Sequence, residues 1–449
     1  MSEPRFLLLL NPGRQSRFYL LGLARAASRL GIPAFALELK PLWDQVQQAN
    51  DKLAATQAVG RELAKLCERE RLTHVLGYGY NGVELGRVFG PGVEPLFASL
   101  GLQHLMLWTD HPNWMMNGIA MGAQMAGLLA HPRHVHFLKS DIAAAEAKGV
   151  LGWPNVFGLA MAEDYELVRP AADVLPTHDV VGIIGSAGAV CAEAARFLDD
   201  GDPDAGAIDA ALAPAALSEM DAAMKGLAGW ADARDQALAW GERVLAAKRE
   251  RPLDGLWRIA TEGGVVPPPW LVADARRWYP AAAALRTSVQ WRRDFWLAWL
   301  ARRRTVLLCG CDARAITPDQ PEWARAWVDY EQQSRVYALG GCAINTNAAH
   351  DEEGCTHKPF QIAASGVACV HHASRGLAEL FHEPEEIMSF AGGTALLEAV
   401  DTARLRRGDF ARAIRERAVR DHTWDGRLLN MLELAKAASQ AQDAKAGPA

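Results

Sequence analysis

The sequence lacks the features that define several protein classes. Its 47 Lys and Arg are outnumbered by 53 Asp and Glu, so the net charge is −6 and there is no global basic field. Nonspecific nucleic-acid binding relies on Lys and Arg that neutralise phosphates, so this composition disfavours a nucleic-acid partner. No stretch approaches the ~18 consecutive apolar residues of a membrane-spanning helix. A soluble enzyme fits these absences best.

Cysteine pairs and a secretory leader are also missing. The seven cysteines include no Cys-x-x-Cys, which argues against a zinc ribbon, and their odd number argues against a disulfide framework. The apolar run at 6–10 is cut short by Asn11-Pro12-Gly13-Arg14, whereas a signal peptide would continue to a small-residue cleavage site. We therefore expect a cytoplasmic protein.

The first part of the chain alternates short apolar runs with helical stretches, which is typical of βα units in a parallel sheet. The apolar runs lie at residues 6–10, 34–39, 74–78, 104–108 and 135–138. This rhythm predicts a Rossmann-like domain over residues 1–175. In such open sheets, ligands bind outside the carboxyl ends of the strands.

A second alternation of the same kind begins after residue 178 and predicts another Rossmann-like domain over 176–408. Its strand candidates are residues 180–184, 305–308, 336–338, 343–346, 367–370 and 387–390. Residues 192–304 have almost no β-branched runs and hold eight of the 15 Trp, so we expect a helical insertion there. We expect closing helices at 409–438 that pack back on the N-terminal domain, and a mobile tail at 439–449.

The first candidate site is at Asp110, the only formally charged residue between 96 and 132. It follows the apolar run 104–108 and precedes His111. A carboxylate and an imidazole at the end of a strand suit general-base chemistry, because either can accept a hydroxyl proton. An Asp before a Pro-containing turn is also an ordinary helix cap, so that alternative stays open.

The loop after the first strand is a candidate anion-binding turn. Asn11, Gly13 and Arg14 precede a helix whose free N–H groups would face a ligand. The loop lacks Gly-x-Gly-x-x-Gly, which disfavours a dinucleotide-dependent dehydrogenase. Alternatively, the glycine simply ends the strand.

Residues 343–390 carry the most informative pattern, in which a strand leads into a polar loop and a short helix opens near Pro359. Lys358 at this helix start would attract a diphosphate, and nearby carboxylate or amide side chains would hold ribose or sugar hydroxyls. The alternative is that Lys358 and Glu353 are solvated loop charges.

This stretch resembles the donor-binding half of GT-B glycosyltransferases, most closely the CgeB-like (spore maturation protein B, glycosyltransferase group 1) family. The resemblance rests on Lys358, Phe360, Gln361, Ala364-Ser365-Gly366 and Gly376-Leu377-Ala378-Glu379-Leu380-Phe381. With lower specificity it extends to Trp108-Thr109-Asp110-His111-Pro112, the Gly185 loop, Cys309-Gly310-Cys311-Asp312 and Arg420-Asp421-His422-Thr423-Trp424.

The resemblance implies an α/β protein of two facing Rossmann-like domains, with the nucleotide-sugar donor on the C-terminal one and the acceptor on the N-terminal one. It implies a glycosyltransferase that moves a hexosyl or related sugar to a protein, glycan or small-molecule acceptor. The residues it assigns to catalysis are Asp110 and His111. The residues it assigns to the donor are Gly185, Ser186, Gly310, Glu353, Lys358, Gln361, Gly376 and Glu379.

The chain departs from the family pattern at one position. Related retaining enzymes carry a Glu-x7-Glu pair for sugar and ribose, and here the counterpart is Glu353-x7-Gln361. An amide accepts a hydrogen bond more weakly than a carboxylate and also donates one. The substitution keeps two alternatives open, a nucleotide-sugar epimerase of the same architecture and a non-catalytic sugar-nucleotide or protein-binding module.

No metal or other cofactor is expected. Metal-dependent glycosyltransferases of another fold carry Asp-x-Asp after a strand, and here that spelling occurs only at 200–204, with no apolar strand before it. An apolar stripe at 295–300 is flanked by Arg and suits either an anionic membrane surface or a buried crossover helix. We favour the buried helix over peripheral membrane contact.

Overall fold

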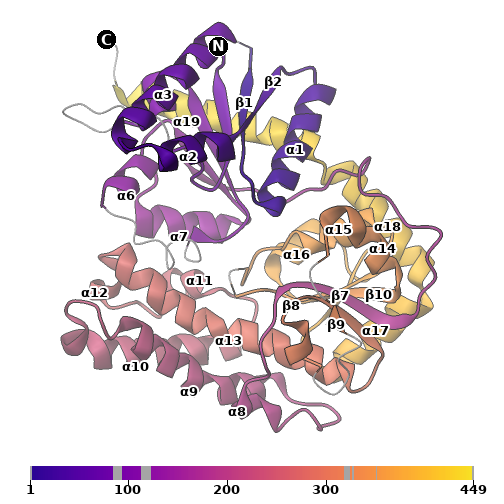
Figure 1. The fold of residues 1–449 in the computed structure, drawn as a ribbon. Coiled ribbons are helices and arrows are strands. Elements are labelled where there is room, and N and C mark those ends of the chain that lie inside the picture. The colour runs from indigo at the N-terminus through magenta and orange to yellow at the C-terminus, as the bar shows by residue number, and fades with distance from the viewer. Residues whose placement is uncertain are drawn as a thin grey trace. The chain divides into compact units, whose positions relative to one another are not determined.

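The computed structural model describes residues 3–83, 94–112, 123–317, 324–325, 328–349 and 351–446 (Figure 1). The chain divides into two compact units. Unit 1 comprises residues 1–159 and 424–449, and unit 2 comprises residues 160–423.

Unit 1 is built on a six-stranded parallel sheet of order β2-β1-β3-β4-β5-β6. Its strands are β1 (Phe6–Leu10), β2 (Ala34–Glu38), β3 (His74–Tyr78), β4 (Gln103–Trp108), β5 (His134–Leu138) and β6 (Val156–Gly158). Its helices are α1 (Arg14–Arg29), α2 (Leu39–Gln48), α3 (Lys52–Arg69), α4 (Leu96–Ser99), α6 (Ala123–Leu129), α7 (Asp141–Leu151) and α19 (Trp424–Ala446). Strands β1, β4 and β5 are buried along their whole length, as expected where helices cover both faces of a parallel sheet.

Unit 2 is built on a second six-stranded parallel sheet, of order β12-β11-β10-β7-β8-β9. Its strands are β7 (His178–Ser186), β8 (Val306–Cys311), β9 (Ala324–Arg325), β10 (Gly340–Asn345), β11 (Cys369–His372) and β12 (Met388–Phe390). Its helices outside the insertion are η1 (Ala313–Ala315), η3 (Tyr330–Gln332), α14 (Gln333–Ala338), α15 (Lys358–Ala364), α16 (Arg375–Leu380), α17 (Gly393–Leu405) and α18 (Arg407–Asp421). The two sheets confirm the predicted fold class of two Rossmann-like domains.

One predicted strand is wrong. Residues 336–338 belong to helix α14, which buries Ser334, Tyr337 and Ala338. These positions are spaced i, i+3 and i+4, so they share one helical face, and the single β-branched residue Val336 was too weak a strand signal. Strands β6 and β9 were not predicted; they are three and two residues long.

The helical insertion lies between β7 and β8. Its helices are α8 (Ala192–Ala195), α9 (Ala205–Met224), α10 (Trp230–Glu250), α11 (Leu256–Thr261), α12 (Pro269–Val272) and α13 (Ala275–Ala301). Figure 1 shows α9 lying beside both α10 and α13. The insertion is therefore a small helical layer placed within the first crossover of the second sheet.

The last turns of α13 form a buried crossover helix, as predicted. Phe295, Trp296 and Trp299 are fully buried, and they pack in one core with strand β8. Within the described residues, no helix combines the length and the hydropathy required to span a membrane.

Much of the tryptophan surplus packs inside the insertion itself. The ring centroids of Trp240 and Trp278 are 5.6 Å apart, those of Trp257 and Trp278 are 5.2 Å apart, and those of Trp230 and Trp270 are 5.9 Å apart. Aromatic pairs at these distances stabilise a core beyond their area burial.

The unit boundaries differ from those expected from the sequence. The first change of unit falls after residue 159 rather than 175, and α18 stays with unit 2 while α19 belongs to unit 1. Helix α19 packs on α1, where Arg29 Nε pairs with Asp425 at 3.0 Å. Buried positions at Leu428, Met431, Ala435 and Ala438 extend its apolar face, so the expected tail from residue 439 is helical as far as Ala446. Residues 447–449 lie outside the described part.

Each sheet has one topological switch point, where the direction of strand winding reverses. In unit 2, counting β7 as the first strand gives the order 6-5-4-1-2-3, which is the Rossmann order, and the reversal lies between β7 and β10. In unit 1 it lies between β1 and β3. Ligands of open α/β sheets bind outside the carboxyl ends of the strands at such points.

Candidate functional site

The switch point of unit 2 is lined by the loops after β7 and β10. Gly185 and Ser186 end β7, and Asn345 ends β10. The strands are parallel neighbours, so both loops leave the same edge of the sheet. The side chain of Ser186 lies outside the described residues.

Gly310 belongs to this edge because its backbone closely approaches strand β7. Its φ is +147°, and a Cβ placed there would lie 2.1 Å from the carbonyl oxygen of Ile184. A side chain is therefore excluded at this position for both conformational and steric reasons. Gly310 keeps the end of β8 against β7 and has a structural role at the predicted donor site.

Lys358 begins α15, the helix that follows the loop after β10. Its Nζ donates to Gln361 Oε1 at 3.0 Å and to Gln333 Oε1 at 3.3 Å, and it lies 5.7 Å from the ring centroid of Tyr330. Burial lowers the pKa of Lys358 to about 8, and this is partly opposed by the charge of Glu163. A lysine whose hydrogen-bond partners are neutral amides keeps its positive charge available for an anion.

The residue before α15 is a buried histidine, His357, which contacts a buried carboxylate, Glu163. His357 Nε2 lies 2.9 Å from the Ala162 carbonyl oxygen and 3.1 Å from Glu163 Oε2. Thr356 Oγ1 accepts from Asn345 Nδ2 at 2.9 Å and from the Lys358 N–H at 3.2 Å. The backbone that presents Lys358 is therefore tied to the end of β10.

Two buried polar atoms near the end of β10 have no hydrogen-bond partner in the described part of the chain. They are Thr346 Oγ1 and Asn347 Oδ1, and both residues are buried. A buried oxygen without a partner is costly, so such atoms in a native fold call for water or a ligand. These two residues were not among the predicted site residues, although their place at the end of a strand was a usable signal.

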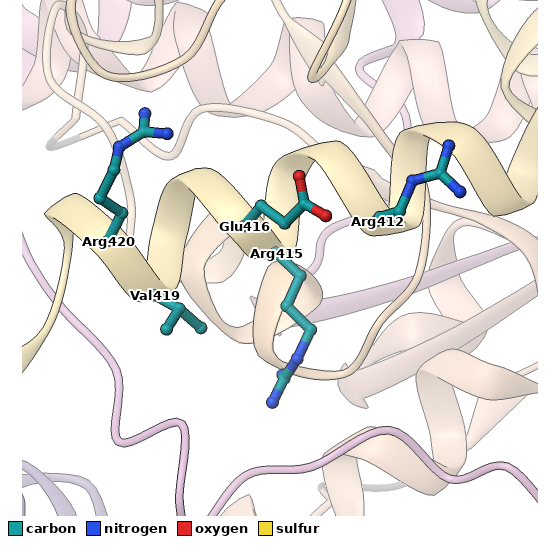
Figure 2. Close-up of a pocket in the computed structure, with 5 residues that line it drawn as sticks. All are labelled: Arg412, Arg415, Glu416, Val419 and Arg420. Carbon is teal, nitrogen blue, oxygen red and sulfur yellow. The ribbon is translucent and has the colours of Figure 1, made fainter.

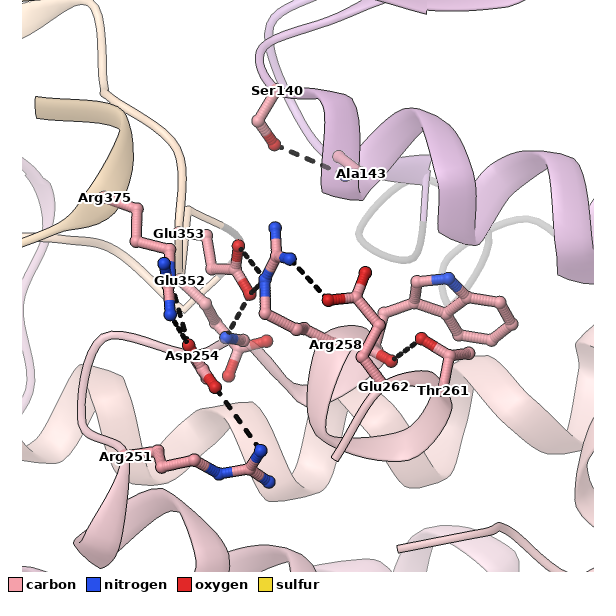
Figure 3. A network of polar contacts seen from close by, with 12 residues as sticks. Ser140, Ala143, Arg251, Asp254, Arg258, Thr261, Glu262, Glu352, Glu353 and Arg375 are labelled. Carbon is pink, nitrogen blue, oxygen red and sulfur yellow. Dashed lines mark hydrogen bonds and ion pairs between the residues drawn. The ribbon is translucent and has the colours of Figure 1, made fainter. Parts of the chain in front are cut away.

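Glu353 is in contact with the helical insertion rather than free in the loop (Figure 3). Its Oε1 accepts from the Gly255 N–H at 2.6 Å, and both of its oxygens lie 3.0 Å from Arg258 Nε. Burial raises the pKa of this carboxyl, and Arg258 and Gly255 oppose the rise. The alternative of a solvated loop charge does not describe Glu353, which is 4% exposed.

Gly376 and Glu379 lie on α16. The Gly376 N–H donates to the Glu353 carbonyl oxygen at 2.7 Å, and a Cβ at Gly376 would lie 2.8 Å from that oxygen. Glycine is therefore required where the loop crosses the helix start. Glu379 is exposed on the same helix.

In unit 1, Asp110 follows β4 and is partly buried. The hydroxyl of Tyr78, from the end of β3, donates to Asp110 Oδ2 at 3.1 Å and also contacts Thr109 Oγ1. One oxygen of the carboxylate is thus oriented by a phenol. His111 is buried beside Glu146 of α7, with Nε2 and Oε2 3.3 Å apart. Glu146 was not predictable from the local sequence, because it comes from a helix 35 residues after His111.

The loop after β1 forms a local turn at the switch point of unit 1. Asn11 Oδ1 accepts from the Gly13 N–H at 2.8 Å, and the Gly13 carbonyl accepts from Ser16 Oγ at 2.8 Å. Gly13 is extended, with φ −62°, so its backbone conformation is open to other residues. Arg14 is exposed at the first position of α1. The anion-binding role of this loop stays a prediction.

A pocket of 440 Å³ lies elsewhere in unit 2, along α18 (Figure 2). It is lined by Arg412, Arg415, Glu416, Val419 and Arg420. Arg412 pairs with Asp409 at 3.0 Å and Arg420 pairs with Asp421 at 3.0 Å. None of the predicted site residues lines this pocket.

The fold and the edge residues of unit 2 define a class, an α/β protein with a buried lysine after the strand at a Rossmann switch point. The two parallel sheets fit the predicted two-domain, Rossmann-like GT-B fold. Residues 292–433, from the last turns of α13 into α19, match a family model described as "Glycosyl transferase-like". That segment contains Lys358, Gln361, Gly376 and Glu379. The match supports a transferase. No curated protein matches the chain by sequence.

Solved glycosyltransferase structures are similar to the chain over nearly its whole length. A glycosyltransferase from Rickettsia africae has 9% identity and a TM-score of 0.43, covering 98% of this chain and 99% of its own. Anabaena HepE in complex with UDP-glucose has 9% identity and a TM-score of 0.47 over 98% and 99%. AviGT4, a glycosyltransferase of avilamycin A biosynthesis, has 12% identity and a TM-score of 0.43 over 96% and 97%.

Proposed function

We propose that the protein is a glycosyltransferase of the CgeB-like type, which moves a hexosyl or related sugar from a nucleotide-diphosphate sugar to a protein, glycan or small-molecule acceptor. The observation that carries the proposal is Lys358, a cation held by two amides at the switch point of unit 2, within the segment that matches the family model. We further propose that the reaction needs no metal and takes place in the cytoplasm.

In this mechanism Lys358 binds the donor diphosphate and stabilises the negative charge that develops as the glycosidic bond to phosphate breaks. Gln361 contacts the nucleotide ribose through its amide nitrogen, because its Oε1 accepts from Lys358. Thr346 and Asn347, whose buried oxygens have no partner in the described chain, accept hydrogen bonds from donor hydroxyls. The loops at Gly185, Ser186 and Gly310 border this donor site.

Asp110 acts on the acceptor. Its carboxylate accepts the proton of the acceptor hydroxyl as the new glycosidic bond forms. The Tyr78 hydroxyl, which donates to Asp110 Oδ2 at 3.1 Å, orients this carboxylate. His111, backed by the Glu146 carboxylate, supplies a second polar group beside Asp110. Arg14 and the loop at Asn11 and Gly13 add anion contacts.

The test is incubation of the protein with a panel of UDP-, GDP-, ADP- and dTDP-sugars, with nucleotide diphosphate release and sugar isomers measured separately. Release from one donor, increased by an acceptor mixture, is the expected result. Isomer formation without release would replace the transferase with the epimerase. Neither product, together with no thermal shift from any nucleotide, would overturn both.

A variant pair locates the donor site. Lys358→Ala should weaken nucleotide diphosphate binding about tenfold to a hundredfold, because a charge-assisted hydrogen bond contributes roughly 1.5–3 kcal/mol. Lys225→Ala removes an exposed lysine of the insertion and should leave binding unchanged. Equal affinities in both variants would remove Lys358 from the site.

A further inference from the structure

We propose that the helical insertion positions the donor loop, and that Glu352 is the main positioning residue. The inference rests on the proposed function, because it assigns to the insertion control over the loop that presents Lys358 and Gln361. Two adjacent residues of the loop after β10, Glu352 and Glu353, carry the inference. Their carboxylates bind residues of the insertion (Figure 3).

Glu352 joins three helices of the insertion at one carboxylate. It pairs with Lys248 of α10 and with Arg286 Nε of α13 at 2.8 Å, and it accepts from the N–H of Leu256 at the start of α11 at 3.0 Å. Lys248 and Arg286 hold the pKa of Glu352 at about 2, although burial works in the opposite direction. A buried carboxylate with two cations and an N–H is fully partnered, so its position is strongly fixed.

Glu353 and Arg375 add two parallel links between the same segments. Glu353 binds Arg258 and the Gly255 N–H through its carboxylate, and binds the Gly376 N–H through its carbonyl oxygen. Arg375 Nε donates to Asp254 Oδ1 at 2.9 Å. The loop after β10, the start of α16 and the start of α11 are therefore held together by charged and backbone hydrogen bonds.

The insertion also reaches the other loop of the switch point. Asp294 of α13 is fully buried, and its Oδ2 accepts from the Gly188 N–H at 3.0 Å. Arg293 Nε compensates the same carboxylate at 3.0 Å. Both loops that border the predicted donor site are thus attached to one helical layer that a minimal Rossmann unit does not contain.

The consequence concerns geometry at Lys358. The loop runs from Glu353 through Cys355 and Thr356 to the start of α15, so a shift at Glu353 moves the backbone that carries Lys358. A displacement of about 1 Å at a positioning group is enough to change binding or turnover by a large factor. The ion pairs of the insertion therefore set donor affinity without touching the donor.

The experiment compares Glu352→Gln with a matched variant inside the insertion. Asp209→Asn breaks a comparable pair of α9 and α13, in which Arg292 lies 2.9 Å from Asp209, and among the described residues no hydrogen bond or ion pair joins these two side chains to either loop. Arg258→Gln is the second test variant, because Arg258 is more exposed and its loss is less disruptive to folding. All are measured at a temperature where each variant is fully folded by circular dichroism.

Two readouts are taken on the full-length chain. Hydrogen–deuterium exchange of the peptides covering 346–366 should rise at least tenfold in Glu352→Gln and less in Arg258→Gln, and stay within twofold of the wild type in Asp209→Asn. The dissociation constant of the nucleoside diphosphate that binds the wild type best, among UDP, GDP, ADP and dTDP, should rise at least tenfold in Glu352→Gln and less than twofold in Asp209→Asn.

The outcomes separate this inference from the proposed function. Unchanged exchange in both Glu352→Gln and Arg258→Gln would overturn the inference, as would equal exchange and equal loss of affinity in Asp209→Asn. If the wild type binds none of the four nucleotides, the proposed function fails. The exchange data then still decide whether the insertion holds the loop.

Discussion

Each unit is built on its own parallel sheet, but an ion pair of unit 1 and one of unit 2 differ in their burial. In unit 1 several ion pairs lie at the surface, such as Arg17 with Glu38, whose side chains are 42% and 47% exposed. In unit 2 the ion pairs that join the insertion to the loop after β10 include a buried one, Glu352 with Arg286, whose side chains are 6% and 5% exposed, while other pairs lie at the surface. Buried charges cost several kcal/mol unless they are fully partnered, so this loop is under more electrostatic constraint than the surface pairs of unit 1.

The carboxyl edges of the two sheets differ in the same way. The edge of unit 1 offers a carboxylate, Asp110, oriented by a phenol. The edge of unit 2 offers a cation, Lys358, oriented by amides. A proton acceptor suits an acceptor hydroxyl, and a cation suits a diphosphate, so the comparison predicts separate effects on turnover and on donor affinity.

The largest expected effect is on turnover at unit 1. Asp110→Asn removes the proton acceptor and should lower turnover by about 10²–10⁴-fold, the usual contribution of general acid–base catalysis. Nucleotide diphosphate affinity should not change. The measurement is steady-state kinetics with the donor found in the panel, together with calorimetric titration of the nucleotide. Asp44→Asn, at an exposed pair with Lys40, is the control. Loss of nucleotide affinity in Asp110→Asn would break the division of roles between the units.

The next effect is on stability at unit 2. Glu352→Gln leaves Lys248 and Arg286 without their shared carboxylate and should lower the free energy of unfolding by about 3–5 kcal/mol at pH 7. Denaturant unfolding followed by circular dichroism measures it. A loss below about 1 kcal/mol would show that this pair is no stronger than a surface pair.

The pH dependence of unfolding tests the same ion pairs of Glu352. The pKa of Glu352 is lowered from 4.5 to about 2 in the folded protein, so its stabilisation is complete above about pH 4.5 and is lost as the pH falls toward 2. Over that interval Glu352→Gln should lose less stability than the wild type. Parallel curves would contradict the assignment.

A moderate effect is expected on donor affinity as the pH rises. Burial lowers the pKa of Lys358 to about 8, so the cation that binds a diphosphate is lost above that pH. Affinity for the nucleotide should fall about tenfold between pH 7 and 9, as expected for one proton linked to binding. Lys358→Gln should bind weakly with a flat profile. A wild-type profile as flat as that of the variant would remove Lys358 from the diphosphate contact.

Much of the fold was predictable because several of its strands are fully buried apolar runs bounded by polar turns. The run at 6–10 matches β1 in full, and 104–108 misses only the first residue of β4. Periodicity failed at 336–338, where three residues cannot distinguish a strand from one buried turn of helix. The edge strands β6 and β9 were too short to leave a signal.

The candidate site was predictable only in part. Asp110 was predictable because it follows an apolar strand, and Lys358 was predictable because it begins a helix after a polar loop. Their neighbours were not predictable, because Glu146 beside His111 and Arg258 beside Glu353 come from helices far along the chain. Long-range pairing of this kind depends on tertiary packing and has no local pattern in a single sequence.

The smallest effect is expected at an exposed ion pair of unit 1, Arg17 with Glu38. Glu38→Gln removes the carboxylate that lies 2.6 Å from Arg17 Nη1 in unit 1, and the free energy of unfolding should fall by less than about 1 kcal/mol. Both side chains are largely solvated, so water replaces the lost partner, and salt screens what remains. Raising the ionic strength should abolish the difference from the wild type, whereas the loss in Glu352→Gln should persist because buried pairs are screened much less. A salt-resistant loss at Glu38 would mean that unit 1 also depends on its ion pairs for stability, and the contrast between the two units would then lie in position rather than in strength.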